Sequence, residues 1–182
     1  MSKLLKNKKI AIVIAFKGFK DPEYFIPRDI LETAGAEIIT VSSEKGTAFG
    51  DDGGEAKVDL IASEADPAEF DAVVFIGGPG MGENLDNREF QSIAEKAVEK
   101  GKVLAAICIA PALLAKAGLL RDRKATVWSS YMDKSAIKIL KENGAVYEEK
   151  DVVIDGRIVT AAGPHAAEQF GQALIGVLTS TS

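Results

Sequence analysis

Cys108, the only cysteine of the chain, is the residue best placed for nucleophilic chemistry. It follows the apolar run 103–107 and precedes a helical pattern over 110–117, so it lies where a buried strand passes into a helix. Ligands of open parallel sheets bind beyond the carboxyl ends of the strands, and the N–H groups of a helix N-terminus favour a thiolate. The position predicts a reactive thiol. The alternative is a buried cysteine that packs as a small apolar side chain.

Glu23 is the candidate acid/base for this thiol. It follows the first apolar run, 9–15, within the helix start Asp21-Pro22-Glu23, and therefore belongs to the same edge of the predicted sheet. Like-charge repulsion and desolvation raise the pKa of a carboxyl beside a thiolate, so that the two groups share one proton. The alternative is an acidic residue that only interacts favourably with the helix dipole.

A glycine-rich turn, Gly77-Gly78-Pro79-Gly80, follows another buried strand at 72–76. Glycine allows backbone N–H groups to approach a ligand closely. The N–H groups of Gly78 and Ile109 are therefore candidates for an oxyanion hole that faces Cys108. The spacing fits neither a P-loop nor the dinucleotide fingerprint, and a plain turn is the alternative.

Two further residues are candidates for the pocket. His165, the only histidine, lies near the start of the last helix, where a surface or capping role is the alternative to catalysis. Trp128 ends a predicted strand at 125–128 and is expected either to wall the pocket or to pack in the core. One cysteine and one histidine leave neither an internal disulfide nor a zinc cluster, so we expect no metal and no cofactor.

Short apolar runs alternate with helical segments, which predicts an α/β fold, a mostly parallel sheet with helices on both faces. The expected strands are 9–15, 37–41, 72–76, 103–107 and 125–128, followed by a hairpin over 152–160 that turns at Asp155-Gly156. The expected helices are 21–34, with Asp21 as N-cap and Pro27 as a kink, then 87–99, 110–117, 134–143 and 164–178. Residues 44–59 are expected to form a loop or a small exposed hairpin. We expect one domain, 1–182.

Composition excludes several classes of partner. The 182 residues carry a formal net charge of −5, which argues against binding to nucleic acid or to a membrane surface. No stretch approaches the roughly 20 apolar residues of a membrane span, and the apolar run at 10–16 is too short for a signal peptide. We therefore expect a cytoplasmic protein that acts on a small molecule.

Four stretches together resemble the ThiJ/PfpI family, which belongs to the class I glutamine-amidotransferase-like superfamily and has a flavodoxin-like three-layer sandwich fold. They occur in the family's order and are 23–29 (EYFIPRD), 73–80 (VVFIGGPG), 105–111 (AAICIAP) and 156–164 (GRIVTAAGP). The resemblance implies that Cys108 is the family's elbow cysteine, Glu23 its protonated carboxyl partner, and Gly78 and Ile109 its backbone donors, with Gly77 beside them. It also implies a homodimer or a higher homo-oligomer.

The sequence departs from the family pattern at its histidines. The protease-like branch has a histidine directly after the cysteine, where this chain has Ile109. Another branch has a histidine on the strand after the elbow helix, where this chain has Trp128. A mechanism that needs a histidine shuttle therefore requires His165 to reach the pocket.

The resemblance leaves two main functions open. The first is a glutathione-independent glyoxalase or deglycase that acts on small reactive carbonyls, with Cys108 as nucleophile and Glu23 as acid/base. The second is a non-enzymatic redox sensor or chaperone, in which Cys108 oxidises to a sulfinic acid. An intracellular cysteine peptidase is a third hypothesis, which Ile109 disfavours.

Overall fold

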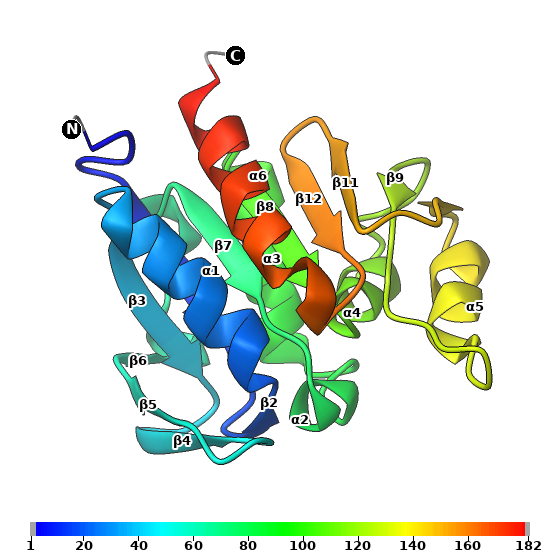
Figure 1. Ribbon diagram of the computed structural model, residues 1–182, viewed down its shortest axis with the longest axis horizontal. Helices are drawn as coiled ribbons and strands as arrows, with labels where there is room; N and C mark the ends of the chain where they lie inside the picture. Colours follow the sequence, from blue (N-terminus) through cyan, green and yellow to red (C-terminus); the bar gives the residue numbers. More distant parts are fainter. Residues whose placement is uncertain (1–2, 181–182) are drawn as a thin grey trace.

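A seven-stranded sheet forms the middle layer of the computed structural model, which describes residues 3–180 (Figure 1). Its strand order is β11-β12-β8-β7-β1-β3-β6, and every neighbouring pair is parallel except β11 with β12. The strands are β1 (Lys9–Val13), β3 (Glu37–Ser42), β6 (Leu60–Ile61), β7 (Ala72–Phe75), β8 (Val103–Ile107), β11 (Val152–Asp155) and β12 (Ile158–Ala161). The mostly parallel sheet expected from the sequence is confirmed.

Helices cover both faces of this sheet. The face that carries Ile12 and Val74 packs against α1 (Asp21–Thr33) and α6 (Ala167–Thr179), which lie side by side in front of the sheet in Figure 1. The face that carries Val13 and Val73 packs against α3 (Arg88–Glu99), α4 (Ala110–Lys116) and α5 (Ser135–Glu142). Because successive side chains of a strand point to opposite faces, strands between two helical layers are apolar at every position. The three-layer α/β fold is therefore confirmed.

A smaller three-stranded sheet lies beside the carboxyl ends of the main strands. It consists of β2 (Lys17–Phe19), β4 (Gly46–Gly50) and β5 (Glu55–Val58), of which β4 and β5 form the hairpin expected within 44–59. The Asp21 carboxylate accepts hydrogen bonds from the N–H groups of Asp52, at 3.0 Å, and Gly54, at 2.6 Å. The prediction that Asp21 caps α1 is wrong, because its carboxylate holds the hairpin turn instead and Lys20 is the residue that precedes the helix.

The expected strand at 125–128 is much shorter in the structure. Strand β9 (Lys124–Ala125) pairs with β10 (Val146–Tyr147) outside the main sheet. Beyond it, the Thr126 N–H donates to Thr160 Oγ1 and the Trp128 N–H donates to the Cys108 carbonyl, at 2.8 Å. In this segment, one hydrogen bond to a side chain and one to a backbone carbonyl thus replace the regular hydrogen bonds of a paired strand.

The remaining elements are short. Helix α2 spans Pro79–Gly82, and 3-10 turns span Ala62–Glu64, Pro67–Glu69 and Pro164–Ala166, so the helical segment expected at 164–178 opens with a 3-10 turn. Between residues 3 and 180, no helix has both the length and the apolar character that crossing a bilayer requires.

Candidate active site

Three neighbouring strands bring the candidate residues together at one edge of the sheet. Strand β8 ends directly before Cys108, and β7 ends shortly before Gly77 and Gly78. Strand β1 leads through β2 to the first turn of α1, which carries Glu23. Since β1, β7 and β8 are adjacent and parallel, their carboxyl ends meet, and the residues predicted from separate stretches of sequence form one site.

Cys108 has a strained backbone conformation that the surrounding chain holds in place. Its φ of 64° lies in the left-handed region, which non-glycine residues rarely adopt. Its N–H donates to the Ala161 carbonyl at 2.9 Å, and its carbonyl accepts from the Trp128 N–H at 2.8 Å. Strain of this kind costs on the order of 1–3 kcal/mol and is concentrated at functional sites. A sharp strand-to-helix turn that presents a nucleophile is the geometry of a nucleophile elbow.

Glu23 is fully buried, with none of its surface exposed. Neither of its carboxyl oxygens has a hydrogen-bond partner among the nitrogen and oxygen atoms of residues 3–180. Burial raises the pKa of Glu23 to about 8, and the interactions with the Cys108 side chain and with the Lys20 ammonium lower it by less. A buried carboxyl whose facing group is a thiol is a strong functional candidate, because buried polar groups are otherwise almost always paired.

The same burial acts on the thiol. Burial and the Glu23 charge raise the pKa of Cys108 to about 12, although the backbone N–H groups of Ile109 and Gly78 donate to the sulfur and lower it. The N–H donors favour a thiolate, as expected from the sequence, but desolvation and the facing carboxyl outweigh them. The pair titrates as a unit that loses its first proton near pH 8.

Gly77 and Gly78, which lie beside the Cys108 thiol and the Glu23 carboxyl, leave no room for a side chain. A Cβ on Gly77 would lie 2.6 Å from the Cys108 Cβ, 2.8 Å from the Ile107 carbonyl oxygen and 3.1 Å from Glu23 Oε1. Gly78 has a φ of 112°, and a Cβ there would lie 2.5 Å from the Gly18 carbonyl oxygen. The two glycines therefore allow the thiol, the carboxyl and the Gly78 N–H to approach one another.

A cavity of about 350 Å³ opens over the half-buried thiol. We call it the cysteine cavity; its walls include Lys20, Asp51, Gly78, Cys108, Ile109 and Trp128. Lys20 and Asp51 are pocket residues that sequence reasoning missed. Their positions in the sequence could have identified them as candidates, because Lys20 lies three positions before Glu23 and Asp51 lies in the glycine-rich hairpin. The Lys20 ammonium is 3.7 Å from an Asp51 carboxylate oxygen and 3.0 Å from one of Asp52.

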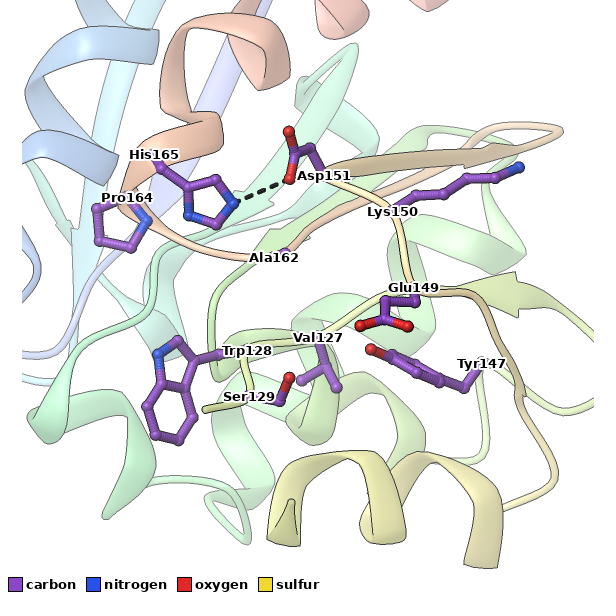
Figure 2. A pocket seen from close by; sticks show the side chains of 10 residues that line it. All are labelled: Val127, Trp128, Ser129, Tyr147, Glu149, Lys150, Asp151, Ala162, Pro164 and His165. Atoms are coloured by element: carbon purple, nitrogen blue, oxygen red, sulfur yellow. Dashed lines mark hydrogen bonds and ion pairs between the residues drawn. The ribbon is translucent and has the colours of Figure 1, made fainter. Parts of the chain in front are cut away.

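His165 does not line the cysteine cavity. Its Nε2 is 3.0 Å from Asp151 Oδ1, and both side chains are more than half exposed. The pair borders a neighbouring cavity, drawn in Figure 2. Trp128 and Pro164 belong to the walls of both cavities. The side chain of Trp128 is thus a pocket wall rather than part of the core.

Comparisons with known proteins agree with this geometry. The sequence profile of the DJ-1/PfpI family matches residues 8–176. The chain belongs to the DJ-1/PfpI family. Relatives within this family include an uncharacterized protein of Methanocaldococcus jannaschii, 39% identical over 92% of this chain and 80% of its own length. A protein of Escherichia coli named protein/nucleic acid deglycase 2 is 33% identical over 94% of this chain and 98% of its own.

Solved structures of the DJ-1/PfpI family have the same fold. A ThiJ/PfpI domain protein from Brachyspira murdochii superimposes with a TM-score of 0.91 and 34% identity, over 97% of this chain and 99% of its own. Drosophila melanogaster DJ-1beta superimposes with a TM-score of 0.81 and 26% identity, over 96% and 91% of the two chains. The resemblance seen in the four sequence stretches therefore extends to nearly the whole chain.

Proposed function

We propose that this protein is a cysteine-dependent enzyme that acts on small reactive carbonyls, with a glyoxalase- or deglycase-like reaction. The observation that carries the proposal is the fully buried Glu23 carboxyl, which has no nitrogen or oxygen hydrogen-bond partner within residues 3–180 and faces Cys108 on a strained turn beneath a cavity. Family members named deglycases, such as those of Escherichia coli and Pyrococcus furiosus, support a reaction of this class.

The proposed reaction begins when the Cys108 sulfur adds to the aldehyde carbon of a 2-oxoaldehyde. The proton of the thiol passes to the carbonyl oxygen, and a hemithioacetal forms. The N–H groups of Gly78 and Ile109, which already point at the sulfur, lie next to the oxygen on which negative charge develops.

Glu23 then moves a proton between two carbons. In its ionised form, its carboxylate removes the proton from the carbon bound to sulfur and returns it to the neighbouring carbon, while the hydroxyl proton of the first carbon passes to the oxygen of the second, so the first carbon is oxidised and the second is reduced. The product of this step is a thioester on Cys108. Water cleaves the thioester, releases a 2-hydroxy acid and restores the thiol. Methylglyoxal plus one water thus gives lactic acid, with no external oxidant.

Two other functions use the same cysteine. Redox sensing is the second candidate, favoured by a half-buried thiol whose sulfur accepts two backbone N–H groups that would also hold an oxidised sulfur. Peptidase chemistry is less well supported, since His165 pairs with Asp151 outside the cysteine cavity and Ile109 follows the cysteine. A homodimer or higher homo-oligomer remains part of the proposal by family analogy.

The test is lactate formation from methylglyoxal in the absence of glutathione. We expect turnover by the wild type and its loss, to the rate of buffer alone, in Cys108→Ala and Glu23→Gln. Glu37→Gln, which removes one charge from an exposed position at the opposite end of the sheet, is the matched control and should retain activity. Absence of turnover in the wild type would overturn the carbonyl reaction and favour the redox function, for which peroxide titration of Cys108 is the direct assay.

A further inference from the structure

A second cavity of about 280 Å³ adjoins the cysteine cavity and has no role in the reaction above. Trp128 and Pro164 form part of the walls of both. On its other side the second cavity is bordered by Tyr147, at the end of β10, and by Glu149 and Asp151, in the segment that leads to β11 (Figure 2). A molecule whose reacting carbon lies against Cys108 can therefore extend past Trp128 into this second cavity.

The charged residues that line the second cavity are Glu149, Lys150 and Asp151, with His165 beside Asp151. Figure 2 shows the Glu149 carboxylate and the Tyr147 hydroxyl turned into it, whereas the Lys150 ammonium points away. Lys150 is held outside by Glu148, whose carboxylate is 3.0 Å from its ammonium. The Glu149 carboxylate forms no ion pair with any residue in 3–180, in contrast to Glu148, which pairs with Lys124 and Lys150.

The wall opposite these carboxylates is aromatic. In Figure 2 Trp128 lies on the opposite border of the cavity from Glu149 and Tyr147, and the His165–Asp151 pair borders the cavity between them. Indole is the side chain that attracts cations most strongly through its ring face. An indole at one border and the Glu149 carboxylate, which forms no ion pair within residues 3–180, at the other favour an ammonium or guanidinium group, and they disfavour a carboxylate or phosphate.

We propose that the second cavity binds the cationic arm, an ammonium or guanidinium group, of a carbonyl substrate whose reacting carbon lies against Cys108. The inference rests on the proposed carbonyl reaction and specifies its substrate class. Methylglyoxal occupies only the cysteine cavity. A carbonyl compound that carries a positively charged arm uses both cavities and is the better substrate.

Two arylglyoxals of equal shape test the specificity. The trimethylammonio group of 4-(trimethylammonio)phenylglyoxal is positively charged, and the tert-butyl group of 4-tert-butylphenylglyoxal is its neutral counterpart; the readout is kcat/KM for mandelate formation. Exposed ion pairs are individually weak, so two carboxylates and an indole should favour the cation about five- to tenfold. In Glu149→Gln this ratio should fall below that of the wild type, and in the control Glu37→Gln it should equal that of the wild type. A wild-type ratio of one, or a ratio unchanged in Glu149→Gln, would overturn the proposal.

A binding measurement separates this inference from the proposed reaction. Trp128 is the only tryptophan of the chain, so its fluorescence reports directly on the wall shared by the two cavities. Titration with N-acetylarginine amide should give a saturable change that N-acetylcitrulline amide, its neutral counterpart, does not give, and Glu149→Gln should weaken it. If methylglyoxal is not turned over, the proposed reaction fails and this titration decides the cation site alone: equal responses to both amides overturn it.

Discussion

Replacement of Glu23 by glutamine should stabilise the protein at alkaline pH and have little effect on its stability at acidic pH. The carboxyl is fully buried, and burial raises its pKa from 4.5 to about 8. The native state therefore holds this proton more tightly than the unfolded chain does. The contribution of the protonated Glu23 carboxyl to the free energy of unfolding is fully present below pH 4.5 and is lost as the pH rises towards 8.

The size of the effect follows from the two pKa values. The difference between 4.5 and about 8 is about 3.5 units. At 1.36 kcal/mol per unit, ionisation of Glu23 costs the native state on the order of 4 kcal/mol by pH 8 and less than about 1 kcal/mol at pH 5. Glutamine has nearly the same shape and does not ionise, so its stability should not decline over this range.

The assay is urea unfolding of the wild type and Glu23→Gln at pH 5 and pH 8 under reducing conditions, followed by far-UV circular dichroism. The quantity of interest is the free energy of unfolding of the variant minus that of the wild type. We expect this difference to grow by about 3 kcal/mol between the two pH values. For Glu37→Gln, the exposed control, the difference should stay constant. A Glu23→Gln difference that is the same at both pH values would refute the reasoning, because it would mean that Glu23 ionises in the native state as it does in the unfolded chain.

Three further predictions concern the thiol, its glycine neighbour and the hairpin. Alkylation of Cys108 by iodoacetamide, measured on the whole protein because it is the only cysteine, should be slow at pH 8, because burial and the Glu23 charge raise the pKa of the thiol to about 12; Glu23→Gln, which removes that charge, should accelerate it, and an unchanged rate would contradict the coupling of the two groups. Gly77→Ala should lower the free energy of unfolding by about 1–3 kcal/mol and turnover by about tenfold or more, since the added Cβ would lie 2.6 Å from the Cys108 Cβ. Gly176→Ala is the control, because a Cβ there meets no atom within 4 Å. Equal behaviour of the two variants would refute the packing argument. Asp21→Ala should speed amide hydrogen exchange at Asp52 and Gly54, whose N–H groups donate hydrogen bonds to the Asp21 carboxylate. Protection equal to that of the wild type would show that the hairpin turn does not depend on this carboxylate.

The central sheet could be predicted because its strands lie between two helical layers. The continuous apolar run 103–107 has no polar position that would need solvent, and the structure gives β8 the same bounds. The location of Cys108 and Glu23 at one edge follows from the same reasoning, since Cys108 comes directly after such a strand and Glu23 lies in the first turn of the helix that follows another. These positions depend on chain order and the parallel sheet, both of which are readable from the sequence.

Other features depend on tertiary contacts that no local pattern reveals. Asp21 has the residue type of a helix cap, but its carboxylate binds the hairpin turn brought close by the fold. The segment around Thr126 resembles a strand, but its N–H bonds the Thr160 side chain. The helix N-terminus that favours a thiolate is visible in the sequence, and the desolvation that raises the pKa of the thiol is not. Glu149 stands in a run of charges that is ordinarily solvated, and only the folded chain turns it towards Trp128.

The most direct test of the central claim is the enantiomeric composition of the lactate that the wild type forms from methylglyoxal without glutathione. If Glu23 returns the proton to a substrate held on Cys108, one face of the substrate receives it and one enantiomer should predominate. A racemic product, with no difference between the wild type and Glu23→Gln, would contradict the account, because it would mean that solvent rather than the buried carboxyl delivers the proton.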